Sequence, residues 1–207
     1  MDETDETERR PITRRLFIIG AVVAVAVAAI TGRHLLAPPQ PPAPPRPAIG
    51  GPFSLVDHNA KTVSEADFRG QFMLVFFGYT YCPDVCPTAL TIVADAIKLL
   101  GGQGDAVAPV FITIDPQRDT PEQLAMYVSH FHPRLVGLTG TPEQLTAAAK
   151  AYKVYYAKAP HEDGDSHDFA MDHSSVIYLI GPDGKYLDSF GTGASPEIVA
   201  ARLREFL

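Results

Sequence analysis

The chain has 207 residues, of which 46% are hydrophobic and only two are cysteines, and its formal net charge is −7. From Ala48 onward, 11 Lys and Arg stand against 19 Asp and Glu, a net charge of −8. So acidic a stretch excludes nucleic acid or an anionic lipid surface as a partner held by bulk charge. Its length suits one domain with a sizeable core, which we expect to be monomeric.

The first 37 residues have the pattern of a membrane-targeting segment. Arginines at positions 9, 10, 14 and 15 precede the uncharged stretch 16–30, which becomes long enough to cross a bilayer when residues 31–37 join it. We therefore expect a short cytoplasmic N-terminus over 1–15 and a single-pass inner-membrane anchor or uncleaved signal over 16–37. The remainder would lie in the periplasm or another extracytoplasmic space. Cleavage after the apolar run and export by a twin-arginine signal stay open as alternatives.

A proline-rich stretch follows the predicted anchor. Seven of the ten residues from 38 to 47 are prolines. Such a segment adopts polyproline II at roughly 3.1 Å per residue, so residues 38–50 would form a stalk about 30 Å long that holds the next domain off the membrane. A disordered linker without a preferred length is the alternative.

Residues 51–207 alternate strand and helix patterns. The predicted strands cover 53–56, 61–63, 72–78, 107–114, 135–138, 174–180 and 186–190. The first two form an N-terminal hairpin, and the nearly continuous apolar runs of the next two indicate buried strands. Helices are expected to open at about residue 88 and at the Thr-Pro-Glu or Ser-Pro-Glu starts at residues 120, 141 and 195.

Both cysteines lie at the end of the first buried strand, in Cys82-Pro83-Asp84-Val85-Cys86-Pro87. Open α/β sheets bind ligands at the carboxyl ends of their strands, so both sulfurs should emerge at a site. The prolines predict a bent turn at the cysteines. Pro87 suits the opening position of a helix whose body runs from Thr88 to about Leu100. At a helix N-terminus both thiols should have lowered pKa values. A structural disulfide is the alternative, although so short a loop would stabilise little.

His173 is the third candidate, in Met171-Asp172-His173-Ser174-Ser175 at the mouth of the strand whose regular part is expected over 176–180. The order of elements resembles that of a thioredoxin-like fold. In such a sheet the loop entering this strand lies beside the helix that carries the cysteines, so the imidazole could face both sulfurs. A thioredoxin has a cis-proline at this place, whereas the nearest preceding proline here is Pro160. The alternative is a histidine bonded only to a local backbone group.

Further side chains near the predicted site have two interpretations each. A charged cluster follows the second buried strand and consists of Asp115, Arg118 and Asp119. It either orients the cysteine loop or docks a partner; the alternative is a local turn network. The polar loop 158–172 either lends transient metal ligands or only places the candidate histidine; its candidates are His161, His167 and Met171. We expect surface or packing roles for His34, His130, His132, Tyr79 and Tyr81.

Three motifs together resemble the Sco/SenC family, membrane-tethered thioredoxin-like copper proteins that help assemble the binuclear copper centre of cytochrome c oxidase. The motifs are Tyr79-Thr80-Tyr81-Cys82-Pro83-Asp84-Val85-Cys86-Pro87, Ile114-Asp115-Pro116-Gln117-Arg118-Asp119-Thr120-Pro121 and Asp172-His173-Ser174. The similarity spans about residues 51–207. It implies that Cys82, Cys86 and His173 are the copper ligands.

The chemistry of these three residue types supports a copper site. Two thiolates and an imidazole select Cu(I), and the nitrogen also permits a tetragonal Cu(II) site. A structural zinc site normally has four protein ligands, whereas three leave a position open for handing the metal onward. Oxidation of Cys82 and Cys86 to a disulfide would remove both thiolates and release the metal.

The resemblance implies an α/β, thioredoxin-like domain with a central mixed sheet flanked by helices. It would act as a copper metallochaperone and not as an enzyme, taking copper from an unidentified donor protein to the copper-accepting subunit of cytochrome c oxidase. The alternative is a periplasmic thiol–disulfide oxidoreductase that acts on cysteines of an exported copper protein. The Cys-x₃-Cys spacing, the missing cis-proline and His173 argue against that alternative.

Overall fold

The computed structural model describes residues 49–159 and 169–207. The predicted anchor and nearly all of the predicted stalk lie outside these residues, as do His34, His161 and His167. Among the described residues, no helix is both long and apolar enough to cross a membrane.

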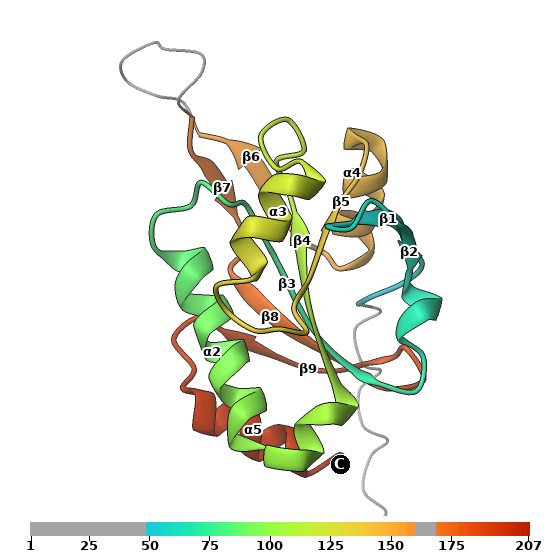
Figure 1. The fold of residues 1–207 in the computed structure, drawn as a ribbon, viewed down its shortest axis with the longest axis vertical. Coiled ribbons are helices and arrows are strands. Elements are labelled where there is room, and N and C mark those ends of the chain that lie inside the picture. Colours follow the sequence, from blue (N-terminus) through green and yellow to red (C-terminus); the bar gives the residue numbers. More distant parts are fainter. Residues whose placement is uncertain (1–48, 160–168) are drawn as a thin grey trace, which may run out of the picture. The chain divides into compact units, whose positions relative to one another are not determined.

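A seven-stranded mixed sheet forms the centre of the domain, in the order β2-β1-β5-β4-β3-β8-β9 (Figure 1). The strands are β1 (Ser54–Asp57), β2 (Thr62–Ser64), β3 (Phe72–Gly78), β4 (Val107–Thr113), β5 (Val136–Thr139), β8 (Val176–Ile180) and β9 (Tyr186–Gly191). The three strands β3, β4 and β5 are parallel, and the outer pairs on both sides are antiparallel. Both β3 and β4 are buried along their whole length, which explains their continuous apolar runs.

Within residues 49–159 and 169–207, four α-helices and two 3₁₀ helices accompany the sheet. They are η1 (Glu65–Phe68), α2 (Val85–Leu99), η2 (Gly101–Ala106), α3 (Pro121–Val128), α4 (Pro142–Ala151) and α5 (Pro196–Arg204). The predicted starts of α3 and α4 are confirmed: the Thr120 and Thr141 side chains accept hydrogen bonds from the amides of Gln123 and Gln144. Both helices have proline at their first position, where its missing N–H costs nothing.

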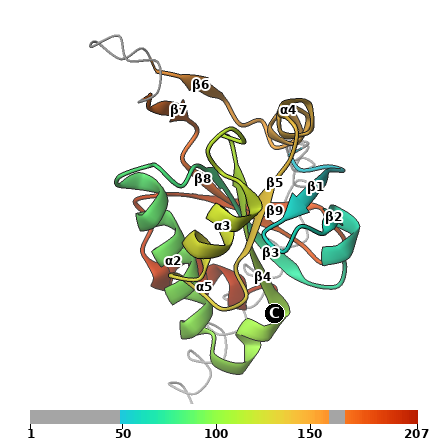
Figure 2. The same ribbon diagram turned by 45° about the horizontal axis from the view of Figure 1, so that its top comes forward.

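Alternating side chains of β3 divide the core between the two faces of the sheet. Phe76 stacks on Phe111 of β4, which contacts Tyr127 of α3. Phe77 points the other way, to Tyr152 at the end of α4. Thus α3 covers one face and α4 the opposite face, while α5 packs beside α2 (Figures 1 and 2). The expected mixed sheet flanked by helices, with its N-terminal hairpin, is confirmed.

A second, two-stranded sheet was not predicted. The strands β6 (Tyr156–Lys158) and β7 (Met171–His173) pair antiparallel, with Tyr156 opposite His173. They extend away from the main sheet in both ribbon views (Figures 1 and 2). The interpretation of 158–172 as a loop is therefore wrong at both ends, and the predicted strand 174–180 begins only at Val176. Strands of three residues are too short for an alternating pattern to reveal them.

Candidate metal centre

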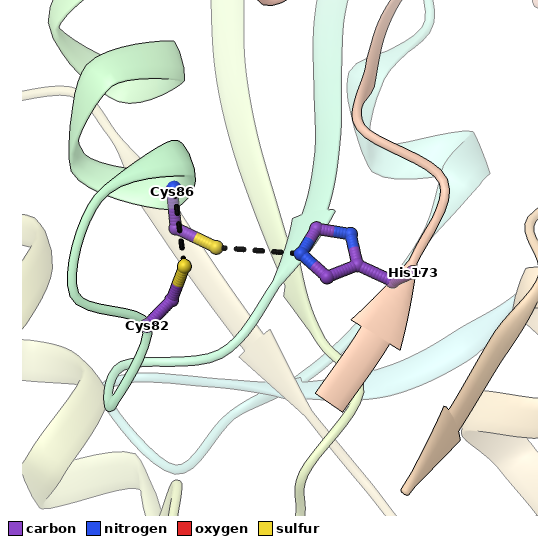
Figure 3. A group of neighbouring side chains, drawn as sticks. All are labelled: Cys82, Cys86 and His173. Carbon is purple, nitrogen blue, oxygen red and sulfur yellow. Dashed lines mark hydrogen bonds between the residues drawn. The ribbon is translucent and has the colours of Figure 1, made fainter. Parts of the chain in front are cut away.

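Three side chains from separate segments converge beyond the carboxyl end of β3 (Figure 3). Cys82 lies in the loop after β3, Cys86 in the first turn of α2, and His173 at the end of β7. The two Sγ atoms and one imidazole nitrogen all lie within 4.8 Å of one another. The structure thus brings together the three residues that the sequence singled out, with both thiols free.

The cysteine loop enters its helix earlier than predicted. Because α2 begins at Val85, Cys86 is its second residue and Pro87 its third. The expectation that Pro87 opens the helix is wrong. A proline in the first turn breaks no hydrogen bond, because the first amides of a helix have no acceptor within it. One of those amides bonds a cysteine sulfur instead: the Cys86 N–H donates to Cys82 Sγ, 3.4 Å away.

The sulfur of Cys86 is packed against the end of β3. Cys86 is fully buried, and a Cβ added to Gly78 would lie only 2.6 Å from its Sγ. The same Cβ would lie 3.0 Å from the Phe111 ring and 3.1 Å from the Phe76 ring. Glycine at the last position of β3 therefore makes the space that the sulfur occupies. The sequence shows this glycine at the end of the strand, but its role depends on a neighbour from the next helix.

A buried carboxylate fixes the segment of chain that leads to the cysteines. Asp119 has no exposed surface and accepts hydrogen bonds from the Thr80 amide (3.0 Å), the Thr80 hydroxyl (2.6 Å) and the Thr113 hydroxyl (2.5 Å). Thr80 lies two residues before Cys82, so the carboxylate fixes the backbone from which the cysteine loop departs. Burial raises the pKa of Asp119, while these three hydrogen bonds oppose the rise.

The imidazole of His173 is oriented from both sides. Its Nδ1 lies 3.1 Å from the Ser174 carbonyl oxygen, which can only accept, so Nδ1 carries the proton. In the neutral ring Nε2 then presents a lone pair, and it lies 3.6 Å from Cys86 Sγ. The rings of Phe76 and Tyr79 pack edge to face against the imidazole, with ring centroids 6.0 and 6.1 Å from its centroid. A backbone partner at one nitrogen and a free lone pair at the other is the usual state of a ligating histidine.

The two thiols differ in their proton affinity. The hydrogen bond that Cys86 donates lowers the pKa of Cys82 to about 3, against the opposing effect of partial burial. The same interaction raises the pKa of Cys86, and its burial adds to the rise. The expectation that both thiols have lowered pKa values is therefore wrong for Cys86. The buried sulfur of Cys86 therefore binds its proton more tightly than the sulfur of Cys82 does.

The structure also decides between the interpretations of the neighbouring side chains. Asp115 and Asp119 share a backbone turn, in which the Asp119 amide donates to the Asp115 carbonyl at 3.0 Å, but the Asp119 carboxylate orients the cysteine loop as well. Met171 is buried in the core, which removes it from the surface where a transient ligand would act. Tyr79 is buried and Tyr81 is exposed, and both pack around the loop as expected. His130 is exposed, and half-buried His132 accepts from the Arg134 amide.

Comparison with known proteins adds independent evidence. A model of the SCO1/SenC family matches residues 41–207. The human protein SCO1 homolog, mitochondrial, is 45% identical over 161 residues, covering 76% of this chain and 52% of that protein. Its mouse counterpart is 43% identical over 160 residues, covering 76% and 56%. The chain thus spans about half the length of these relatives.

Two solved structures are similar throughout the described domain. ScoI of Bradyrhizobium japonicum, solved with copper bound, is 43% identical with a TM-score of 0.70, covering 77% of this chain and all of that one. ScoI of Arabidopsis thaliana, also solved with copper bound, is 41% identical with a TM-score of 0.71, covering 76% and 97%.

Proposed function

The chain belongs to the SCO1/SenC family, and from this membership together with its site we propose that it is a copper metallochaperone acting in cytochrome c oxidase assembly. The observation that carries the proposal is the convergence of Cys82, Cys86 and His173, whose ligand atoms lie within 4.8 Å of one another. Copper is the cargo of this site. The copper-accepting subunit of the oxidase would be the recipient.

The donor set suits copper in both oxidation states. Two thiolates are soft ligands that favour Cu(I), and the Nε2 lone pair of His173 supplies the harder donor that Cu(II) accepts. Copper coordination requires Cys86 as a thiolate, so copper binding releases the proton of this thiol. Cys82 and His173 are half-buried whereas Cys86 has no exposed surface, so an incoming donor or acceptor would reach Cys82 or His173 before Cys86.

A thiol–disulfide exchange role is the second candidate, and the asymmetry of the pair favours it. An accessible cysteine with a lowered pKa beside a buried one is the arrangement of an attacking and a resolving thiol. Such exchange would act on cysteines of an exported copper protein. The two roles can be linked, because a disulfide between Cys82 and Cys86 has no thiolate left to bind metal. Oxidation of the pair would therefore release copper.

The setting that we propose follows from the N-terminal sequence. Residues 16–37 would anchor the protein in the inner membrane as a single-pass segment, with 1–15 in the cytoplasm. Residues 38–50 would form the stalk, and 51–207 the copper-binding domain on the periplasmic side. A reporter fused after Leu207 should be active only in an extracytoplasmic compartment, and activity in the cytoplasm would reverse this topology.

The metal assignment is tested with His173→Ala. The variant retains both thiols, but we expect its Cu(II) affinity to fall by more than about 100-fold. Loss of a group that only hydrogen-bonds a metal ligand already lowers metal affinity by about 10- to 100-fold. The thiolate charge-transfer absorption of the Cu(II) protein should be lost as well. His130→Ala, an exposed histidine on the same chain, is the control and should match the wild type. Unchanged absorption and affinity in His173→Ala would contradict the proposal.

Single cysteine variants separate the two functions. If copper delivery is the purpose, Cys82→Ser and Cys86→Ser should each lose copper and cytochrome oxidase activity to a similar extent, since three ligands include no spare. In thiol exchange only the variant that lacks the buried resolving thiol, Cys86→Ser, accumulates a mixed disulfide with its target. Trapping in that variant alone, with normal oxidase activity in His173→Ala, would favour exchange.

A further inference from the structure

Arg118 is a largely enclosed cation among the segments that carry the site. Its side chain is 16% exposed and forms an ion pair with Asp115, whose side chain is 3% exposed. Its Nη2 donates to the Phe169 carbonyl oxygen at 3.1 Å. The guanidinium carbon lies 4.0 Å from the centroid of the Phe169 ring and 4.8 Å from that of Tyr81. The Tyr79 ring is a third aromatic neighbour, at 5.7 Å.

These partners belong to both halves of the site. Tyr79 and Tyr81 lie in the loop that continues directly into Cys82. Phe169 precedes β7, the strand that ends at His173. The guanidinium thus contacts the chain that delivers the cysteines on one side and the chain that delivers the imidazole on the other. A second connection runs beside it, where the Met171 amide donates to the Tyr79 hydroxyl at 3.3 Å.

The placement of His173 needs such a connection. The strand β7 has three residues and pairs with β6, in a sheet of only two strands. A two-stranded ribbon is marginal by itself, so its position relative to the cysteine loop depends on contacts with the rest of the domain. A guanidinium is suited to this task, because it is planar, stacks on aromatic rings and donates in several fixed directions at once.

We propose that Arg118 is a positioning residue for the metal site, which fixes His173 relative to Cys82 and Cys86 by joining Phe169 to the Tyr79–Tyr81 loop. The proposal rests on the assignment of His173 as a copper ligand under the proposed function. Arg118 itself touches neither sulfur nor imidazole in the contacts described above. It acts through the two segments that it holds together.

The test compares Arg118→Lys with Arg134→Lys. Lysine keeps the charge beside Asp115 but cannot stack as a plane or bond Asp115 and Phe169 together. Arg134 is a matched control, because its guanidinium also bonds backbone carbonyls, those of Gly104, Asp105 and Val107, but around η2. Phe169→Leu removes the stacked ring and keeps the carbonyl, and it serves as a second variant if Arg118→Lys folds poorly.

The first readout uses the full chain without metal. Hydrogen exchange of the amides from Phe169 to His173 should be faster in Arg118→Lys by about tenfold, with exchange in β3 and β4 unchanged. Arg134→Lys should leave exchange in this segment at the wild-type rate. Because no copper is present, this readout is independent of whether the proposed function is right.

The second readout adds Cu(II). Arg118→Lys should retain both titratable thiols, yet its charge-transfer spectrum should shift towards that of His173→Ala, and the double variant should resemble His173→Ala alone. Wild-type exchange and a wild-type Cu(II) spectrum in both Arg118→Lys and Phe169→Leu would overturn the proposal. An unchanged spectrum in His173→Ala itself would instead contradict the proposed function.

Discussion

The two halves of the candidate site rest on very different supports. The cysteine half follows β3, a fully buried strand with β4 on one side and β8 on the other, and it is completed by the first turn of α2. The histidine half ends β7, a three-residue strand in a two-stranded sheet. Segments with few buried contacts open locally at much lower cost than central strands. We therefore expect the two sulfurs to be held more rigidly than the imidazole, whose position depends on the contacts that Arg118 provides.

This difference would matter for the proposed metallochaperone, which must both hold and release a metal. A rigid pair of sulfurs retains Cu(I), whereas a third ligand on a weaker support can leave first and open a coordination position. Each half also has an exposed tyrosine beside it. Tyr81 directly precedes Cys82 in the chain, and the amide of Tyr155 donates a hydrogen bond to the Ser174 hydroxyl. The four variants below test whether the two halves are as unequal as the structure indicates.

The largest effect is expected from Asp119→Ala, on the cysteine half. The change leaves the Thr80 amide and two threonine hydroxyls without their acceptor, which should lower the free energy of unfolding by about 2–3 kcal/mol. Denaturant unfolding measures the loss. Exchange of the Thr80 amide should rise at the same time. A loss within the experimental error would show that the cysteine loop does not depend on this carboxylate.

Asp119 also predicts a direction for the pH dependence of stability. Burial raises the pKa of this carboxyl, so the folded protein takes up a proton at a pH where the unfolded chain has not yet done so. The contribution of Asp119 to stability should therefore increase as the pH falls through its folded pKa towards the ordinary value near 4. Asp119→Asn, which keeps the size, should remove this part of the pH dependence. A pH dependence in that variant identical to that of the wild type would contradict the prediction.

Gly78→Ala should have an intermediate effect. Its methyl group would lie 2.6 Å from Cys86 Sγ, so the sulfur or the strand must shift, at a cost of about 1–2 kcal/mol. Because the shifted atom is a proposed ligand, copper affinity should fall as well. Gly191→Ala in β9 is the control, since an added Cβ there meets no atom within 4 Å. Equal thermal unfolding and copper affinity for both variants would refute the idea that Gly78 makes room for the sulfur.

The smallest effect is expected from Ser174→Ala, on the histidine half. It removes the hydrogen bond that the Tyr155 amide donates to the Ser174 hydroxyl at 3.1 Å, worth about 0.5–1 kcal/mol. Since β6 and β7 open separately from the core, global unfolding should hardly change while amide exchange near His173 accelerates. Ser195→Ala is the control, because that serine lies at the N-terminus of α5 and not in the two-stranded sheet. If the loss appeared in global stability alone, the two halves would unfold as one unit.

The sequence by itself determined the features that depend on neighbours along the chain. The apolar runs of β3 and β4, the capped starts of α3 and α4 and the cysteine pair after β3 were all predicted, because strand burial, helix capping and proline geometry act over a few residues. The three motifs also identified the family, and with it His173, although the spacing of 87 residues between His173 and Cys86 carries no local signal.

Only the tertiary structure decided how the site is held and how its two thiols differ. The hydrogen bond that the Thr80 amide donates to the Asp119 carboxylate spans 39 residues, and no local pattern distinguishes this aspartate from one in an ordinary turn. The high proton affinity of Cys86 comes from burial against Gly78 and from its hydrogen bond to Cys82, whereas the two cysteines look equivalent in the sequence. The position of His173 depends on a short ribbon and on its contacts with the cysteine loop. Burial and long-range hydrogen bonds are properties of the folded chain, so they appear only when distant segments meet.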